Sequence, residues 1–219
     1  MTFEDYALTA VKYYFLAVAS FFPMLNPFGA IPLLLSLTSD MSDAERRQQA
    51  VRASWYTAII MTFCLFLGDA LLWFFGISVG ALRVAGGLIV AYLGFGMLFP
   101  TPKGSAPASQ PSGKRDYAFI PLALPTLSGA GTIAMIIGVS THIAERTSIH
   151  EKIAGYVITL AAIATVSLLT AVILKASVRI NRSLGAQGME AMSRIVGLLM
   201  ICIGVQYVAA GIKLLVETP

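Results

Sequence analysis

The stretch Pro23-Met24-Leu25-Asn26-Pro27-Phe28-Gly29 decides the fold, because a similar one, Pro125-Thr126-Leu127-Ser128-Gly129-Ala130-Gly131, returns in the second half of the chain. Both lie inside apolar segments long enough to cross a membrane. Proline removes a backbone donor and glycine adds backbone freedom, so each stretch predicts a broken helix. In lipid such a break persists only where it is buried in protein or lines a cavity. Two matched breaks, one in each half, indicate the substrate site of a transporter.

The composition is typical of a membrane protein. Of 219 residues, 57% are hydrophobic and 12% are charged, whereas about 25% of the residues of a soluble domain are charged. We expect the net charge of +4 to reflect loop topology, not nucleic-acid binding. The first residues are acidic and no Ala-x-Ala site follows, so we expect no cleavable signal peptide. Cys64 and Cys202 lie in apolar spans and are expected to be small core residues.

We predict an all-α polytopic membrane protein with six transmembrane helices, the first and the fourth broken. The expected spans are roughly 7–38, 49–75, 80–99, 118–141, 151–176 and 190–215. Residues 100–117 are rich in Pro, Gly and Ser and are predicted to be a flexible linker. This linker separates residues 1–99 from residues 118–219, which we expect to form two three-helix units of one membrane domain.

The two units resemble each other beyond the breaks. Ile31 and Ile133 follow the two breaks at the same spacing, and Arg83-Val-Ala-Gly86 near the start of the third span matches Arg194-Ile-Val-Gly197 in the sixth. Because three is an odd number of crossings, a duplicated unit must sit upside down relative to the first. The sequence therefore predicts two inverted three-helix repeats.

Lysine and arginine predict the orientation. Ten of them fall on the face that holds the connections 1–2, 3–4 and 5–6, and five fall on the opposite face. The excess favours the first face as cytoplasmic, with both termini outside the cytoplasm. If one broken segment were re-entrant instead of spanning, this parity would change.

The residues at the breaks predict helix restarts. Asn26 is a preferred N-cap and Pro27 is favoured at the first helical position, so a helix is expected to restart there. Ser128 is expected to cap a second restart at Gly129 in the same way. The preceding half-helices are expected to end near Phe22 and Leu124.

These helix ends indicate the chemistry of the ligand. Free N–H groups at a restart suit a carboxylate, and free carbonyl groups at the preceding end suit an ammonium group or a small cation. An amino-acid zwitterion needs both, and the small residues at the breaks leave room for a small side chain without a counter-charge. The predicted substrate-binding residues are Asn26, Pro27, Phe28, Gly29, Ser128, Gly129, Ala130, Gly131, Thr132 and Gln206.

Other polar residues of the spans allow two interpretations each. Gln206, in the middle of the sixth span, either reaches the cavity or bonds a neighbouring helix. Asp69 is an intramembrane acid and thus a candidate for proton coupling, but it lies close enough to Gly76 to remain at the interface. Thr165, Ser167 and Thr170 either line a path or hold helices together.

A catalytic role is not expected. Gly76-Ile-Ser-Val-Gly80 matches the nucleophile pattern Gly-x-Ser-x-Gly, but a tight turn explains both glycines. The only histidines, His142 and His150, fall in one connection, and no Cys/His spacing resembles a metal site. We therefore expect neither an enzyme nor a metal centre.

The chain resembles the MarC family over about residues 20–215. The motifs that carry the resemblance are the Asn26-Pro27 break, Leu82-Arg-Val-Ala-Gly-Gly-Leu-Ile-Val-Ala91, Gly94-Phe-Gly-Met-Leu-Phe-Pro100, Pro121-Leu-Ala-Leu-Pro125, Gly129-x-Gly-Thr-Ile-Ala-Met135, Ser193-Arg194 and Gly204-Val-Gln206. The family is grouped with LysE-type amino-acid exporters. The resemblance implies transport of small neutral amino acids such as glycine and alanine, driven by a Na⁺ or H⁺ gradient. It also implies a bacterial or archaeal cytoplasmic (inner) membrane.

One position departs from the family pattern. The family commonly has Gly-Pro-Gly at the second break, where this chain has Gly129-Ala130-Gly131, so a softer second break is expected. The interpretation is an alternating-access carrier in the lipid bilayer, with a homo-oligomer as one option and no nucleic acid as partner. The alternatives are an exporter of another small metabolite or drug, and a channel-like or structural membrane protein in which the breaks only shape the bundle.

Overall fold

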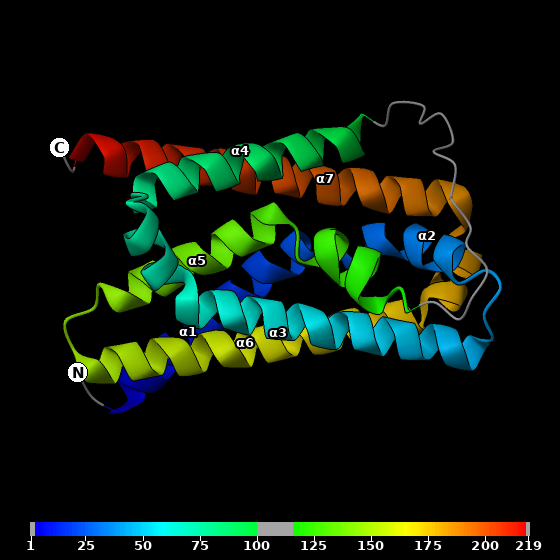
Figure 1. The fold of residues 1–219 in the computed structure, drawn as a ribbon, viewed down its shortest axis with the longest axis horizontal. Coiled ribbons are helices and arrows are strands. Elements are labelled where there is room, and N and C mark those ends of the chain that lie inside the picture. The colour runs from blue at the N-terminus through cyan, green and yellow to red at the C-terminus, as the bar shows by residue number, and fades with distance from the viewer. Residues whose placement is uncertain (1–2, 100–115, 218–219) are drawn as a thin grey trace.

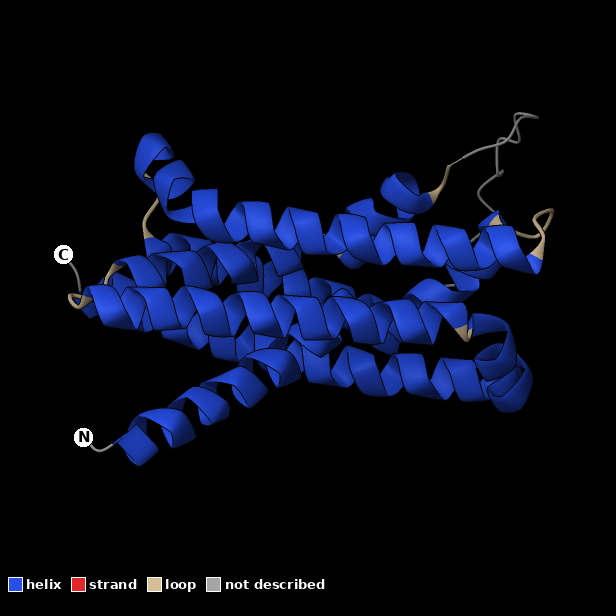
Figure 2. Cartoon of the chain, turned by 90° about the horizontal axis from the view of Figure 1, so that it is seen from below, coloured by secondary structure: helices blue, strands red, loops and turns tan. Residues whose placement is uncertain are grey.

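The computed structural model describes residues 3–99 and 116–217, and this part of the chain is helical without strands (Figure 2). Residues 100–115 of the predicted linker lie outside it. The elements in order are α1 (Phe3–Leu25), α2 (Pro27–Leu37), α3 (Asp43–Phe75), α4 (Val79–Leu98), η1 (Ala118–Leu127), α5 (Ala130–Ala144), α6 (Ile149–Lys175) and α7 (Ser177–Glu217). The all-α prediction is thus confirmed.

The spans agree with the prediction in number and order. Five segments are long and apolar enough to cross a membrane, and η1 with α5 makes a sixth if this bent pair is one span. α1 and α2 together form the first span, Leu8–Leu37. The predicted last span, 190–215, agrees with the observed span Gln187–Val216, although α7 itself begins earlier, at Ser177. A non-helical residue, Gly185 (φ 63°), separates its first turns from the span Gln187–Val216.

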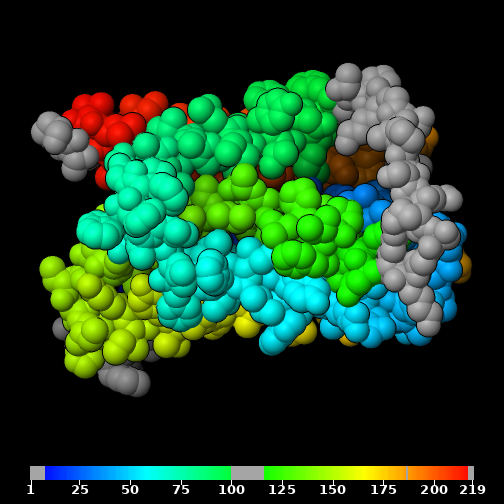
Figure 3. Space-filling model, in the orientation of Figure 1, coloured from blue at the N-terminus to red at the C-terminus, as the bar shows by residue number. Residues whose placement is uncertain are grey.

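The helices run along one long axis (Figure 1). The beginning of α1 and the end of α7 lie at the same end of the bundle, which we call the near end. The end of α2 and the junction of α6 with α7 lie at the opposite, far end. α4 and α7 form one side of the bundle, α3 and α6 form the other, and α2, η1 and α5 lie between them. In the space-filling view, η1 reaches the surface between α3 and α4 (Figure 3).

A seam of glycines joins α4 to α7. Three glycines of α4 each face a glycine of α7 in antiparallel order: Gly80 with Gly211, Gly87 with Gly204, and Gly94 with Gly197. A Cβ added to Gly87 would lie 2.5 Å from the carbonyl oxygen of Gly204. Small residues allow such close backbone approach between membrane helices. An inverted repeat would produce this reciprocal pairing, although the repeat itself stays a prediction.

A tight turn joins α3 to α4. Gly76 ends α3 in the left-handed conformation (φ 64°), which glycine adopts without steric cost. Ser78 then caps α4, because its side chain accepts a hydrogen bond from the N–H of Ala81 at 3.2 Å. The glycine–serine–glycine pattern of this turn therefore has a local structural explanation.

The buried apolar side chains form two clusters, one toward each end of the bundle. The near-end cluster takes its members from α1, α3, α4, α5, α6 and α7, and includes Met24, Leu25, Met61, Leu65, Val90, Met135, Ile136 and Val166. The far-end cluster takes its members from α2, α3, η1, α6 and α7, namely Ala30, Ile31, Leu34, Ala50, Ala53, Ala118, Leu122, Leu127, Leu174 and Met189. Both breaks fall between the clusters, since α1 and α5 contribute only to the first and α2 and η1 only to the second.

Candidate functional site

The first break is a single residue, Asn26. Its backbone is left-handed (φ 46°, ψ 57°), a conformation that asparagine tolerates better than most residues. The Asn26 side chain accepts a hydrogen bond from the N–H of Gly29 at 3.1 Å, and Pro27 is the first residue of α2. The predicted restart at residues 26 and 27 is confirmed.

The end of the preceding half-helix was predicted too early. α1 continues through Pro23 to Leu25 and does not end near Phe22. A proline inside a helix removes one hydrogen bond and kinks the helix without necessarily ending it. The left-handed turn at Asn26 ends α1 instead.

Gly29 provides space for the Asn26 cap. Gly29 is helical, and a Cβ on it would lie 2.8 Å from Cγ of Asn26 and closer still to Nδ2. The side-chain nitrogen Nδ2 of Asn26 also donates a hydrogen bond to the sulfur of Met97 on α4 at 3.2 Å. The absence of a side chain at Gly29 therefore lets Asn26 both cap α2 and contact α4.

The second break has a different cap from the one predicted. Gly129 occupies the N-cap position of α5 and no side chain caps that helix, so the prediction that Ser128 caps it is wrong. The N–H of Ser128 donates to the carbonyl of Ala123 at 2.8 Å, which makes Ser128 the end of η1 and shifts the cap by one residue. The Ser128 hydroxyl is fully buried and has no partner among the described residues.

The second break is the sharper one. η1 and α5 meet at 68°, despite Ala130 standing where the family commonly has proline. Ile120 and Leu124 have extended backbone angles, as expected for residues that precede proline. The predicted half-helix ending near Leu124 is therefore an irregular segment that continues to Leu127.

The two breaks touch each other. The Thr132 hydroxyl lies 3.2 Å from the carbonyl oxygen of Met24, 108 residues away, and 3.3 Å from that of Leu127. A Cβ on Gly131 would lie 2.6 Å from Cγ2 of Val90 and 3.7 Å from Cε of Met24. Residues predicted from the two halves of the sequence are thus brought together beside α4.

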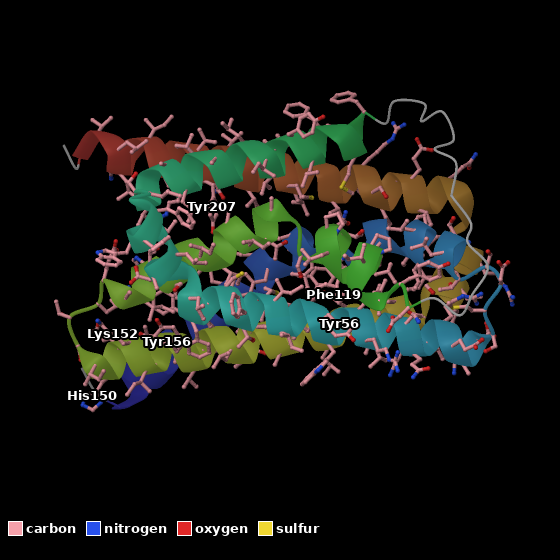
Figure 4. The ribbon with its side chains drawn as sticks, viewed as in Figure 1. Tyr56, Phe119, His150, Lys152, Tyr156 and Tyr207 are labelled. Atoms are coloured by element: carbon pink, nitrogen blue, oxygen red, sulfur yellow. The ribbon has the colours of Figure 1, made fainter. Side chains whose placement is uncertain are left out.

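Side chains of α3 fix the segment that leads into the second break. The Gln49 side chain accepts a hydrogen bond from the N–H of Tyr117 at 3.0 Å. Arg52 pairs with Asp116 at 3.0 Å. The rings of Tyr56 and Phe119 meet edge to face with centroids 5.4 Å apart, and Figure 4 shows these two side chains side by side.

The two restarts differ in the number of N–H groups they leave free. At the first, Gly29 donates to the Asn26 side chain, Ala30 donates to the Asn26 carbonyl, and Pro27 has no N–H. Only Phe28 keeps a free N–H there. At the second restart, no described group accepts from the N–H groups of residues 129–132, and the first bond of the new helix runs from Ile133 to the Gly129 carbonyl at 3.1 Å. The donors are therefore concentrated at the second break.

A layer of buried hydroxyl groups lies at the level of the breaks. On each contributing segment these residues fall between a member of the near-end cluster and a member of the far-end cluster. We call the set the hydroxyl layer; its members are Ser54 and Thr57 on α3, Ser128 and Thr132 at the second break, and Ser167 and Thr170 on α6. All six are at most 6% exposed. Each of these residues is visible in the sequence as a hydroxyl in an otherwise apolar span, but their common level depends on how the helices pack.

Half of this layer has no hydrogen-bond partner in the described part of the chain. Ser54 and Thr57 donate to the carbonyls of Ala50 and Ala53 in their own helix. The hydroxyls of Ser128, Ser167 and Thr170 have none. Buried polar groups are normally paired, so these three indicate a place that a polar ligand or water can fill.

Gln206 does not lie with the other predicted residues. It is exposed on α7, two residues from Gly204 and hence about 200° around the helix from the seam with α4. An open groove of about 480 Å³, lined by Asp69, Trp73, Ser78 and Thr141 among others, lies at the near end and not at the breaks. Asp69 is exposed there, and its N–H donates to the Ser140 hydroxyl at 3.3 Å.

The electrostatics of the layer come from the backbone and the hydroxyls. None of its members is charged, and the described residues contain no group of three or more His, Cys, Asp or Glu side chains placed to bind a metal ion. The site can therefore offer N–H donors at a positive helix end and carbonyl and hydroxyl oxygens at a negative one.

Comparisons with known proteins identify the family of this membrane protein. The family model described as MarC family integral membrane protein matches residues 11–216. Inner membrane protein MarC of Escherichia coli (strain SMS-3-5 / SECEC) is 38% identical over 208 residues, covering 90% of this chain and 92% of the relative. The protein of the same name from Shigella flexneri is 37% identical with the same coverage. No solved structure matches the chain. This multi-span membrane protein therefore belongs to the MarC family of integral membrane proteins.

Proposed function

We propose that this protein is a secondary carrier of small neutral amino acids, such as glycine or alanine, and that it works by alternating access. One observation carries the proposal: the four free N–H groups at the start of α5 lie beside the unpartnered Ser128 hydroxyl and, through Thr132 and Met24, against the carbonyl end of α1. Donors and acceptors of opposite polarity thus meet at two helix breaks, as in carriers with discontinuous helices.

The free donors suit the carboxylate of the substrate. A helix N-terminus attracts anions because its N–H groups and its dipole both point at them. α5 has no side-chain cap, so no protein group competes for these donors. The Ser128 hydroxyl adds one more donor from a buried position. The carbonyls of Pro23 and Met24 at the end of α1 each accept one hydrogen bond and keep a second lone pair for an ammonium group.

Size and charge restrict the substrate to a small neutral one. Gly131 packs against Val90 and Met24, so little space remains beside the α5 terminus. The hydroxyl layer holds no charged residue that could pair with an acidic or basic side chain. Glycine and alanine satisfy both conditions.

We place the protein in the inner membrane with both termini outside the cytoplasm. The relatives are named inner membrane proteins. The far end of the bundle carries Arg46, Arg47, Lys175, Arg179 and Arg182. Under the positive-inside rule, this end faces the cytoplasm.

Uptake into proteoliposomes tests the carrier function. Labelled glycine and L-alanine are added with Na⁺ and H⁺ gradients imposed separately, and saturable, gradient-dependent uptake is expected. The Ser128→Ala variant should raise KM roughly tenfold, since a hydrogen bond to a charged group contributes about 1.5 kcal/mol or more. Its thermal stability should not fall, because the hydroxyl has no partner to lose.

Ser54→Ala is the matched control. It removes a hydroxyl from the same layer that already bonds its own helix, so KM should stay at the wild-type value. Equal KM values for the two variants would contradict a substrate contact at Ser128. Folded, reconstituted protein that takes up neither amino acid under either gradient would refute the glycine and alanine assignment.

A further inference from the structure

We infer that Ser167, Thr170 and the Leu25 carbonyl form a binding site for a small monovalent cation, with Na⁺ the best match, beside the first break. The role of this site in driving transport rests on the proposed function. The binding site itself does not, because its evidence is a set of oxygen atoms on α1 and α6 and not the donors of α5.

The clusters place these oxygens at one level of the bundle. On α6, Val166 belongs to the near-end cluster together with Leu25, and Leu174 belongs to the far-end cluster together with Ala30. Positions between 166 and 174 must therefore lie at the level of the break between α1 and α2. α6 contacts both α1 and α2.

Ser167 and Thr170 differ from two other hydroxyl residues of α6. On the same helix, Thr159 donates to the carbonyl of Gly155 at 2.8 Å and Thr165 donates to that of Ala161 at 2.9 Å. This is the usual way to satisfy a hydroxyl in an apolar helix. Ser167 and Thr170, at 6% and 0% exposure, have no such bond and no other partner in the described chain. Being three residues apart, they share one face of α6.

A carbonyl at the end of α1 completes the set. The carbonyl of Pro23 accepts the N–H of Asn26 at 3.1 Å, and that of Met24 accepts the Thr132 hydroxyl. The Leu25 carbonyl accepts no hydrogen bond from any described residue, although Leu25 has no exposed surface. The C-terminal end of a helix also carries a partial negative charge.

These oxygens select the kind of ion. Hard cations take oxygen ligands, and Ca²⁺ or Mg²⁺ sites in proteins normally include carboxylates. The hydroxyl layer contains no carboxylate, so a monovalent cation fits it better than a divalent one. The layer also contains no side chain that titrates near neutral pH, so it offers nothing to carry a coupling proton. A Na⁺ ion matches both conditions.

Thermal unfolding of the purified protein in detergent, without amino acid, tests the site. Na⁺ is titrated against K⁺ and choline at constant ionic strength. A saturable rise of Tm with Na⁺ alone is expected, because a ligand that binds only the folded state stabilises it. In Thr170→Val and in Ser167→Ala, the half-maximal Na⁺ concentration should rise at least tenfold. Thr159→Val, which removes a paired and buried hydroxyl of the same helix, should retain the wild-type response.

The outcomes separate this inference from the proposed function. A Na⁺ response equal to that of K⁺, or the same response in Thr170→Val, Ser167→Ala and Thr159→Val, would overturn the cation site. If Thr170→Val fails to fold, Ser167→Ala and the wild-type ion comparison still decide. A selective Na⁺ response without amino-acid uptake would support the cation site and refute the proposed substrate. Amino-acid uptake without any effect of Na⁺ on Tm would support the proposed substrate and refute the cation site.

Discussion

Replacing glycine with alanine in α4 should lower the thermal stability of the protein at Gly87 and raise it at Gly96. A Cβ on Gly87 would lie 2.5 Å from the Gly204 carbonyl oxygen, 2.8 Å from the Val208 nitrogen and 2.9 Å from Val208 Cγ2. Two of these atoms are backbone, so the methyl can be accommodated only if the two helices separate. A Cβ on Gly96 of the same helix would meet no atom within 4 Å.

The magnitudes follow from helix propensity and overpacking. Replacing glycine with alanine in a helix gains about 1 kcal/mol at either position. Overpacking a close interface costs about 1–3 kcal/mol, and three contacts below 3.0 Å place Gly87→Ala at the upper end. The two variants should therefore differ in stability by about 2–3 kcal/mol. For a chain of this length that difference corresponds to roughly 4–12 °C in Tm.

Thermal unfolding in detergent, followed by circular dichroism, measures the difference. We expect Tm to fall for Gly87→Ala and to rise by a few degrees for Gly96→Ala. Gly204→Ala should lower Tm as well. In the double variant Gly87→Ala/Gly204→Ala, the change in stability should differ from the sum of the two single changes, because both methyl groups enter one contact. A rise of similar size for Gly87→Ala and Gly96→Ala would refute the close approach of α4 and α7.

Three further perturbations test the breaks and the topology. Asn26→Ala should lower Tm more than Asn26→Gly, because alanine loses the cap, worth about 1 kcal/mol, and resists the left-handed backbone, whereas glycine keeps that conformation; equal losses would contradict this geometry. Ala130→Pro should raise Tm, since proline is favoured at the first helical position and the N–H of Ala130 has no partner, and it should raise the KM for glycine, because one of the four proposed carboxylate donors is lost; an unchanged KM would exclude that N–H from the substrate contact. A C-terminal alkaline phosphatase fusion should be active and a C-terminal green fluorescent protein fusion dark; the opposite pattern would reverse the orientation.

Much of the fold could be predicted because membrane spans leave a strong local signal. Long apolar segments, the Asn26-Pro27 pair and the Gly76–Gly80 turn each act within a few residues, and the structure agrees with all three. The ion pair between Glu190 and Arg194, one helical turn apart, is local as well.

The parts that failed depend on contacts between distant segments. Ser128 was expected to cap α5, but its N–H completes η1. Contacts from Gln49, Arg52 and Tyr56 of α3 hold the beginning of η1, and such contacts between distant segments are not visible in the local sequence. A Cβ on Gly131 would lie 2.6 Å from Cγ2 of Val90, a contact from α4 that the local sequence does not reveal. The hydroxyl layer becomes visible only when helices far apart in sequence are aligned along one axis.

The two helix restarts leave different numbers of N–H groups free, and this difference makes the site polar in one direction. The halves of the chain resemble each other, yet Asn26 neutralises most donors of one restart while α5 keeps its own. A bound zwitterion would therefore lie in a single direction, carboxylate toward α5 and ammonium toward α1. The substrate would therefore keep the same orientation in the site whichever side of the membrane the site opens to. Molecules that lack the carboxylate or the ammonium group, such as simple amines or carboxylic acids, would contact only one of the two helix ends.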